Sequence, residues 1–331
     1  MKKIITFFLI ISLFSISSEA IGVIKDTAVD FIQDARKTSY TYLVLGVDAA
    51  AGNTDVIMLF SYNGETNSYS ILGVPRDTYF APSSYPHKIN GYIPSSTQGR
   101  NMDLSDVTAF SHILSDSLGI EIDGTALYTM SAVEGIVDAI GGVEVNIPTD
   151  ISGKLEDGST VHLKAGKRSL NGKEAVFFIR HRGSYLLGDL GRMDAQKLFV
   201  SAFINKLKSG FNLEVAIKLL TYRDEGIITD INTGELISFA LKNITKIKDA
   251  SGKFATLPGK AVSSSNGVSY YSVNKLASEK LLRYMDFRIS SAFDKSCFFR
   301  SNDEMLYTVY SDSGVEYKIY DDEDLINVSP K

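Results

Sequence analysis

The chain has 331 residues, of which 44% are hydrophobic and 22% are charged, and its formal net charge is -5. A chain of this size can bury a substantial core in one large domain or in two. The acidic balance argues against a nucleic-acid-binding surface, since no stripe of lysines and arginines interleaved with aromatic residues offsets it. Cys297 is the only cysteine, which excludes an intrachain disulfide and a cysteine metal cluster.

The first element, residues 1–24, is predicted to be an export signal or an N-terminal membrane anchor. Two lysines follow the initial Met, and residues 4–18 then carry no charge, as in a secretory signal. This uncharged run is shorter than the ~20 residues that cross a bilayer comfortably, so the segment is either cleaved or continues as an uncleaved anchor. Residues 25–38 are polar and are predicted to be a helical spacer. We therefore expect the bulk of the protein to lie outside the cytoplasm.

Three strands are predicted next. Residues 40–47 and 56–62 are apolar runs, which favour buried strands. Asn63-Gly64 is a hairpin signal, so a third strand at residues 68–74 should pair with the second. Pro75 ends this third strand.

Helical periodicity and further strand-like runs follow as far as the C-terminus. The predicted helices cover residues 105–118, 131–140, 171–181, 191–208, 212–222, 233–247 and 274–284. The predicted strands cover residues 143–147, 254–258, 268–273, 305–310 and 316–320, with a polar loop or hairpin at 149–170. Strands that alternate with helices predict α/β layers. The acidic cluster at residues 321–324 is expected to be a solvated face rather than a cation site.

The segment from Arg180 to Gln196 is the most informative part of the chain. It places Arg180, Arg182 and Arg192 around one loop and the start of one helix. Guanidinium groups suit bidentate contact with phosphate oxygens, and three of them would repel one another unless an anion lay between them. Arg192 and Gln196 are four apart and share a helix face, and Asp189 is predicted to be the N-cap. The alternative is that Asp189 only caps the helix and pairs with Arg192 on the surface.

Two aspartates and one further arginine are predicted to gather at the same end of the sheet. Asp48 ends the first strand and Asp55 begins the second, and such carboxylates suit Mg²⁺ or Mn²⁺ together with phosphate oxygens and waters. Arg76 and Asp77 follow the third strand. Two carboxylates, a divalent cation and four arginines are the equipment of phosphoryl transfer. The alternative is that both strand-end aspartates belong to ordinary turns.

Other enzyme classes find little support. The sequence has no GxxxxGK[ST] loop, no GxGxxG after a strand, no HExxH and no GxSxG. The four histidines are scattered along the chain, and we interpret each as structural.

Seven segments follow one another as they do in the LytR-CpsA-Psr family. They are YLVLGVD, TDVIMLFSYN, ILGVPRDTYF, HKINGYI, IVDAIGGVEVNIP, AGKRSLNGKEAVFFIRHR and GDLGRMDAQ. The chain therefore resembles this family over residues 40–284. The resemblance implies that residues 39–285 form one catalytic domain, an α/β/α sandwich around a mixed central sheet with an apolar lipid tunnel. Residues 286–331 would be a C-terminal extension of unknown role.

The resemblance also implies an activity. Members are Mg²⁺-dependent phosphotransferases of cell wall assembly, which move a glycopolymer such as teichoic acid or capsule from undecaprenyl pyrophosphate to peptidoglycan. We therefore expect a membrane-anchored or secreted enzyme of the bacterial cell envelope. Two alternatives stay open: a non-catalytic polyprenyl-phosphate-binding or regulatory envelope protein, and a polyprenyl-pyrophosphate hydrolase.

Each candidate site residue takes a role from the resemblance. Asp48 and Asp55 match the metal-side aspartates. The positions that hold the pyrophosphate are matched by Arg76, Arg180, Arg182, Arg192 and Gln196. Further acidic positions are matched by Asp77 and Asp189, and the segment that lines the site entrance contains Lys88 and Asn90.

The chain departs from the family pattern at three places. The family usually has an arginine where Ala49-Ala50-Ala51 stands here, another at Asn53 and a third at Ala195. Each missing cation should weaken pyrophosphate binding by about 1–3 kcal/mol.

Overall fold

The computed structural model describes most of the chain beyond residue 36. The described residues are 37–47, 53–93, 102–155, 158–185, 188–210, 226–232, 239, 243, 246–264, 267–299 and 304–326. The predicted export signal, most of the predicted spacer, the predicted helix at 212–222 and nearly all of that at 233–247 lie outside them.

The chain divides into two compact units. Residues 38–231 and 244–331 form the larger unit, to which nearly all described residues belong. The smaller unit consists of residues 1–37 and 232–243. Within it, the Asn243 side-chain amide donates a hydrogen bond to the Phe239 carbonyl over 2.9 Å.

A seven-stranded mixed sheet is the centre of the larger unit. Its strand order is β13-β10-β3-β2-β1-β4-β9. These strands are β1 (Ser39–Val47), β2 (Thr54–Asn63), β3 (Ser68–Gly73), β4 (Gly124–Thr129), β9 (Ile227–Thr229), β10 (Ser251–Thr256) and β13 (Ile319–Asp321). The pairs β1–β4 and β3–β10 are parallel, and the other neighbouring pairs are antiparallel. The predicted mixed central sheet is therefore confirmed.

The three predicted N-terminal strands and their hairpin are also confirmed. Strands β2 and β3 pair antiparallel, with Asn63 opposite Ser68. The Asn63 side-chain oxygen accepts hydrogen bonds from the backbone N–H groups of Glu65 and Thr66, which closes the turn. Strand β1 lies beside β2 with the opposite direction. The end of β1, the start of β2 and the end of β3 therefore meet at one edge of the sheet, and this edge positions the candidate site.

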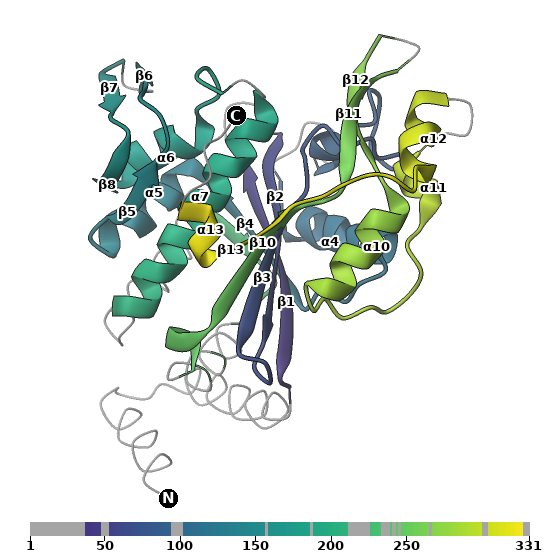
Figure 1. The fold of residues 1–331 in the computed structure, drawn as a ribbon, viewed down its shortest axis with the longest axis horizontal. Helices are drawn as coiled ribbons and strands as arrows, with labels where there is room; N and C mark the ends of the chain where they lie inside the picture. Colours follow the sequence, from purple (N-terminus) through teal and green to yellow (C-terminus); the bar gives the residue numbers. More distant parts are fainter. Residues whose placement is uncertain are drawn as a thin grey trace, which may run out of the picture. The chain divides into compact units, whose positions relative to one another are not determined.

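Helices cover both faces of this sheet, as an α/β/α sandwich requires. Figure 1 shows α4 (Leu104–Leu118) and α10 (Lys275–Tyr284) on one side and α5 (Met130–Ala139), α6 (Gly172–Arg180) and α7 (Asp189–Gly210) on the other. Helix α4 buries Val107, Phe110 and Leu114 in one core cluster with Leu43 and Leu59 of the sheet. The spacing of three and four along α4 puts these side chains on one helix face.

Small two-stranded sheets complete the side that contains α7. Strand β5 (Val143–Ile147) pairs with β8 (Gly166–Leu170), and β6 (Ile151–Lys154) pairs with β7 (Thr160–Leu163). With α5, α6 and α7 they enclose a second apolar cluster, which includes Val145, Phe178, Ala195 and Phe199. On the α10 side, β11 (Gly259–Ser263) pairs with β12 (Ser269–Val273). The apolar tunnel implied by the family resemblance stays a prediction.

The strand prediction at residues 305–310 is wrong, because this segment belongs to α12 (Glu304–Ser311). Leu306, Val309 and Tyr310 are buried, and their spacing of three and four is helical. The strand prediction at residues 316–320 is partly confirmed by β13. Two short helices complete the C-terminal part: α11 (Lys295–Phe298) and α13 (Asp322–Ile326).

One member of the acidic cluster at residues 321–324 is not simply solvated. The Asp322 carboxylate accepts hydrogen bonds from the Tyr69 hydroxyl over 2.6 Å, the Gly252 N–H over 2.9 Å and the Ser201 hydroxyl over 3.4 Å. Burial and the Asp322 hydrogen bond together raise the pKa of Tyr69. Asp322 therefore connects the C-terminal segment to β3, β10 and α7.

We predict that Asp322→Asn lowers the free energy of unfolding by about 1–3 kcal/mol, since buried donors lose a charged acceptor. Asp324→Asn is the matched control, because the Asp324 side chain is exposed on the same short helix. Urea denaturation of both variants measures the effect. Equal midpoints for Asp322→Asn and the control would contradict the assigned role.

Candidate active site

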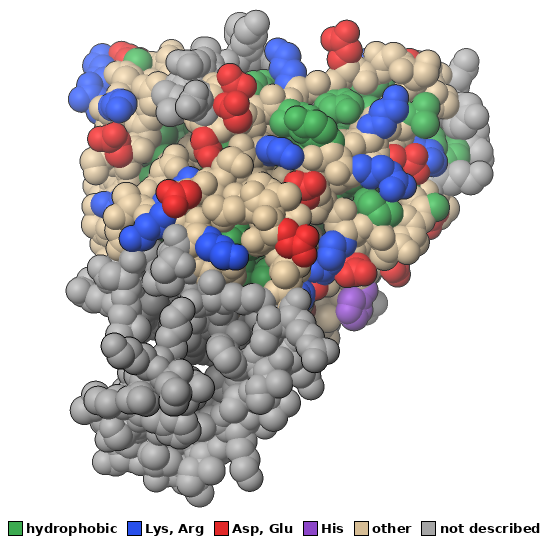
Figure 2. Space-filling view, turned by 60° about the horizontal axis from the view of Figure 1, so that its bottom comes forward, with side chains coloured by type: hydrophobic (Ala, Val, Ile, Leu, Met, Phe, Trp, Pro, Cys, Tyr) green, Lys and Arg blue, Asp and Glu red, His purple; other side chains and the backbone are tan. Residues whose placement is uncertain are grey.

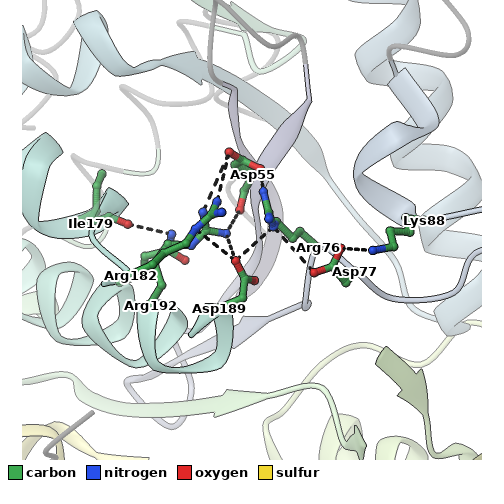
Figure 3. A network of polar contacts seen from close by, with 9 residues as sticks. Asp55, Arg76, Asp77, Lys88, Ile179, Arg182, Asp189 and Arg192 are labelled. Atoms are coloured by element: carbon green, nitrogen blue, oxygen red, sulfur yellow. Dashed lines mark hydrogen bonds and ion pairs between the residues drawn. The ribbon is translucent and has the colours of Figure 1, made fainter. Parts of the chain in front are cut away.

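Four segments bring charged side chains together at the sheet edge. Asp55 comes from the start of β2 and Arg76 from the segment after β3. Arg182 follows α6, and Asp189 and Arg192 lie in the first turn of α7. Figure 3 shows the three arginines around the two carboxylates. We call these five residues the arginine cluster.

The distances in the arginine cluster show shared ion pairing rather than separate pairs. Asp55 Oδ1 lies 2.5 Å from Arg76 Nη1. Asp55 Oδ2 lies 3.8 Å from Arg182 Nη2 and 4.0 Å from Arg192 Nη1. Asp189 Oδ1 lies 2.9 Å from Arg192 Nη2, 3.1 Å from Arg76 Nε and 3.5 Å from Arg182 Nε. Each carboxylate therefore contacts all three guanidinium groups.

This network leaves hydrogen-bonding capacity unused. The Nε–H groups of Arg76, Arg182 and Arg192 are buried and donate to no acceptor, and Asp189 Oδ1 accepts no hydrogen bond despite its ion pairs. Three guanidinium charges against two carboxylates leave a net charge of +1 in the arginine cluster. Unsatisfied buried donors are rare in proteins, and at a charged site they indicate a ligand. The ligand that fits is an anion with several oxygen acceptors.

Arg192 is the most deeply buried member, with only 2% of the residue exposed. Its Nη2 donates to the Asp55 backbone carbonyl over 3.2 Å. The pKa of Arg192 is lowered to about 10, chiefly by burial. The charges of Arg182 and Arg76 also lower it, whereas those of Asp189 and Asp55 raise it. The alternative of a surface pair between Asp189 and Arg192 is therefore wrong. Asp189 is the first residue of α7, and its carboxylate faces arginines.

The pKa of Arg76 is shifted in the opposite direction to that of Arg192. Burial alone would lower its pKa, but the hydrogen bond to Asp55 and the charges of Asp189 and Asp77 outweigh that effect and raise it. Two further ion pairs share Asp77. Asp77 Oδ2 is 4.0 Å from Arg76 Nε, and Asp77 Oδ1 is 2.8 Å from Lys88 Nζ. The Asn90 N–H donates to the Arg76 carbonyl over 3.3 Å. Asp77 and Lys88 therefore support Arg76 through ion pairs, and Asn90 supports it through its backbone N–H.

Two predicted site residues, Gln196 and Arg180, do not belong to the arginine cluster. The Gln196 amide donates to the Ile179 carbonyl over 3.2 Å, so this side chain joins α7 to the last turn of α6. Arg180 lies at the end of α6 and lines a pocket together with Arg182. Asp48, the other predicted metal aspartate, lies outside the described residues.

Sequence reasoning missed Tyr185, which lies in the loop between α6 and α7. The Tyr185 N–H donates to the Arg182 carbonyl over 3.1 Å, which fixes this loop. Its side chain is buried, its hydroxyl has no partner, and burial raises its pKa to about 12. The sequence signal is an aromatic residue three positions after Arg182.

The structure also describes two of the positions where the family usually has an arginine. Ala195 is completely buried among the apolar side chains around α7. Asn53 is half-buried beside β2, and residues 49–51 lie outside the described residues.

Within the described part of the chain, no group of three or more His, Cys, Asp or Glu side chains is arranged to hold a metal ion. The same described residues contain no helix that is both long enough and apolar enough to cross a membrane.

A mixed sheet between helical layers, with converging arginines at its edge, defines an α/β domain with a positively charged site that suits an anion. The LytR_cpsA_psr family model matches residues 12–286. The protein therefore belongs to the LytR-CpsA-Psr family, as the sequence segments predicted.

Two relatives are named as polyisoprenyl-teichoic acid–peptidoglycan teichoic acid transferases. TagV of Bacillus subtilis is 25% identical over 213 residues, which cover 62% of this chain and 53% of TagV. TagU of Oceanobacillus iheyensis is 27% identical over 250 residues, which cover 72% of each chain. The chain thus spans about half the length of TagV.

Solved structures share the fold. Protein gbs0355 of Streptococcus agalactiae has a TM-score of 0.66 at 20% identity, with 81% of this chain and 95% of that chain covered. TagT bound to LIIa-WTA has a TM-score of 0.57 at 22% identity, with coverages of 75% and 90%.

We predict that Arg182→Gln weakens binding of inorganic pyrophosphate about tenfold, since a charged hydrogen bond of about 1.4 kcal/mol is lost. Its side chain is 40% exposed, so the fold should tolerate the change. Calorimetric titration at low salt measures the affinity. Arg168→Gln, an exposed change on β8, is the control. Unchanged affinity in Arg182→Gln would exclude this arginine from the anion site.

We predict that the stability of the fold depends on pH through His181, which lies between Arg180 and Arg182. Burial lowers the pKa of His181 below its usual 6.5, and its Nε2 accepts the Ser184 N–H. The unfolded chain therefore takes up this proton at a higher pH than the folded chain, so stability is lost as the pH falls below about 6.5. His181→Gln should reduce this loss between about pH 6.5 and 5, whereas His112→Gln on α4 should retain it. Urea unfolding at both pH values measures the difference.

Proposed function

We propose that this protein is a phosphotransferase that moves a glycopolymer from a polyprenyl (undecaprenyl) pyrophosphate carrier to peptidoglycan. The single observation that carries the proposal is the arginine cluster, with a net positive charge and three buried Nε–H groups that have no acceptor. A pyrophosphate supplies both the charge and the oxygen acceptors that these groups need. The names of the relatives TagV and TagU support the polymer and the acceptor.

The proposed reaction is an in-line attack on phosphorus. A sugar hydroxyl of peptidoglycan attacks the phosphorus that bears the glycopolymer and releases its proton to water as the new P–O bond forms. The bond from this phosphorus to the bridging oxygen breaks, so that polyprenyl phosphate leaves with the negative charge. The three guanidinium groups are already oriented, so they stabilise this charge without reorganisation. Lys88 and Asp77 hold Arg76 from one side, and the Gln196 hydrogen bond holds α6 against α7 from the other.

A divalent cation fits the donor chemistry of Asp55. Mg²⁺ binds through one or two carboxylates, with phosphate oxygens and waters as its other ligands. Asp55 places one partly exposed carboxylate beside the guanidinium groups that would hold the phosphates. We propose that Asp55 and Asp48 hold Mg²⁺ or Mn²⁺, which neutralises charge on the pyrophosphate when bound.

The proposed function also includes a binding place for the prenyl chain of the carrier and a location at the membrane. An apolar cluster formed by α5, α6, α7 and β5 to β8 lies beside the arginine cluster, because α7 contributes to both. We propose that the prenyl chain inserts on this side. The protein would then act at the outer face of a bacterial membrane, with residues 1–24 as its export signal or anchor.

The test is to incubate the full chain in detergent with a polyprenyl-pyrophosphate-linked saccharide and a peptidoglycan acceptor, with and without Mg²⁺. Mass spectrometry should detect released polyprenyl phosphate and saccharide on the acceptor. Arg192→Gln and Arg182→Gln should reduce turnover at least a hundredfold, as loss of transition-state charge stabilisation does. Asp55→Asn should lose the response to Mg²⁺, whereas Asp116→Asn on α4 should retain it.

The products separate the proposal from its alternatives. Release of polyprenyl phosphate without transfer to the acceptor would show a hydrolase. Binding of the lipid without cleavage would show a non-catalytic carrier-lipid-binding protein, and full turnover in both arginine variants would exclude the arginine cluster as the active site.

A further inference from the structure

The segment after β3 presents an aromatic side chain to solvent. Tyr85 is 71% exposed, more than any other large hydrophobic residue in the described part of the chain. A single exposed tyrosine is common on protein surfaces and by itself indicates no function. Two further features distinguish this one, namely the fixed backbone around it and the histidine beside it. We call residues 78–88 the Tyr85 loop.

Hydrogen bonds fix the backbone of this loop. The Phe80 N–H donates to the His87 carbonyl over 2.7 Å, and the His87 N–H donates to the Ser84 carbonyl over the same distance. The Tyr270 hydroxyl, on β12, donates to the Pro86 carbonyl, also over 2.7 Å. The exposed ring is therefore carried by an ordered backbone, so little conformational entropy of the protein is lost when a ligand stacks on it.

His87 adopts a backbone conformation that is uncommon for a residue with a side chain. Its φ is 60°, in the left-handed region, where strain is often retained at functional sites. Its Nδ1 lies 2.6 Å from the Ser83 carbonyl oxygen. Because a carbonyl only accepts, Nδ1 carries the hydrogen, and Nε2 of the neutral ring carries a lone pair. No described residue donates to Nε2, so this atom can accept a hydrogen bond from a ligand.

The rings of Tyr85 and His87 lie next to each other. Their centroids are 6.3 Å apart and their planes are nearly perpendicular, at 86°. A ligand that covers the exposed tyrosine ring therefore lies within reach of the imidazole. A sugar ring suits this pair, since its C–H groups pack on an aromatic face and its hydroxyl groups donate to a nitrogen acceptor.

Charge does not account for ligand recognition at this place. The whole chain carries a net charge of -5. On the face shown in Figure 2, Lys and Arg side chains alternate with Asp and Glu side chains, so no continuous field of one sign covers it. Neither a tyrosine nor a neutral histidine adds charge. The pair therefore favours an uncharged sugar, held by stacking and by a hydrogen bond, over an ionic group.

The Tyr85 loop reaches the arginine cluster through Lys88. Lys88 Nζ lies 2.8 Å from Asp77 Oδ1, and Asp77 also pairs with Arg76. Figure 3 shows Lys88 and Asp77 on one side of Arg76, and Arg182 and Arg192 on the other. The Tyr85 loop therefore adjoins the arginine cluster on the side away from α7.

The proposed reaction determines which sugar reaches that side. In an in-line displacement, the attacking and leaving oxygens lie on opposite sides of the phosphorus. The proposed place of the prenyl chain is the apolar cluster on the α7 side. The attacking hydroxyl then enters from the side of Lys88, so the sugar next to the Tyr85 loop belongs to the acceptor.

We propose that Tyr85 and His87 form a subsite for an uncharged N-acetylhexosamine ring of the acceptor glycan. The sugar stacks on the Tyr85 ring, and one of its hydroxyl groups donates to His87 Nε2. The inference rests on the proposed function and identifies two residues that bind its acceptor. Both hold the glycan strand beside the arginine cluster, so that a hydroxyl group of the strand can reach the phosphorus.

The first experiment measures binding without turnover. The probe is a tetrasaccharide of N-acetylglucosamine, which is uncharged, added to the full chain in detergent. Excess inorganic pyrophosphate is present throughout, so that the arginine cluster is occupied. Saturation-transfer NMR, with irradiation of the aromatic protons, should show transfer to the C–H protons of one sugar ring, and titration of this signal gives the Kd. Absence of transfer would overturn the proposal.

The variants locate the binding to the Tyr85 loop. Tyr85→Ser should weaken binding about tenfold, as loss of an aromatic contact does, whereas Tyr85→Phe keeps the ring and should bind as the natural protein does. His87→Asn tolerates the positive φ but removes Nε2, and should also weaken binding. Tyr284→Ser is the matched control, because Tyr284 is 57% exposed at the end of α10. Unchanged binding in Tyr85→Ser, or an equal loss in Tyr284→Ser, would overturn the proposal.

The transfer assay identifies which substrate supplies the sugar. Tyr85→Ser should raise the KM for the peptidoglycan acceptor but not the KM for the polyprenyl-pyrophosphate donor. A raised donor KM, or an unchanged acceptor KM, would contradict the assignment to the acceptor. A protein that binds the tetrasaccharide but transfers nothing would refute the proposed transfer alone, because the binding measurement does not depend on turnover.

Discussion

The central constraint on this structure is the repulsion between three guanidinium groups that the fold holds within reach of the same two carboxylates. Asp55 and Asp189 each contact all three, so the network is compact and yet still carries an excess positive charge. Burial makes this excess costly, as the lowered pKa of Arg192 indicates. The anion proposed for this site would remove the cost and accept hydrogen bonds from the three Nε–H groups. The site is therefore organised before its ligand arrives.

The fold supplies that organisation from elements far apart in the sequence. The hairpin of β2 and β3 and the neighbouring β1 bring strand ends to one edge, where Asp55 and Arg76 meet. Helix α7 then crosses the same edge with Asp189 and Arg192 in its first turn. The hydrogen bond from Gln196 to the end of α6 fixes the loop that contains Arg182. Local turn chemistry, helix packing and site electrostatics thus depend on one another.

The sequence predicted this much because the relevant signals are local. Apolar strand runs, an Asn-Gly turn and closely spaced arginines predicted that Asp55, Arg76 and Arg192 lie at one edge of the sheet, without knowledge of the remaining topology. Side-chain direction was not predictable, since whether Gln196 faces the anion or α6 depends on tertiary packing. The helix at residues 304–311 was missed because a short apolar run has no decisive period. The role of Asp322 was missed because its partners Tyr69, Ser201 and Gly252 are all distant in the sequence, the nearest of them 70 positions away.

Strand β13 has a consequence for any shortened form of the protein. The family match ends at residue 286, whereas β13 covers one side of β10 through antiparallel pairing of residues 319–321. A chain cut at the family boundary would leave this side of Ser251–Thr256 as an open strand edge, with unpaired N–H and carbonyl groups. Open edges of this kind recruit strands from other molecules. Loss of the C-terminal segment would therefore appear first as self-association in solution, before any defect in chemistry was measured.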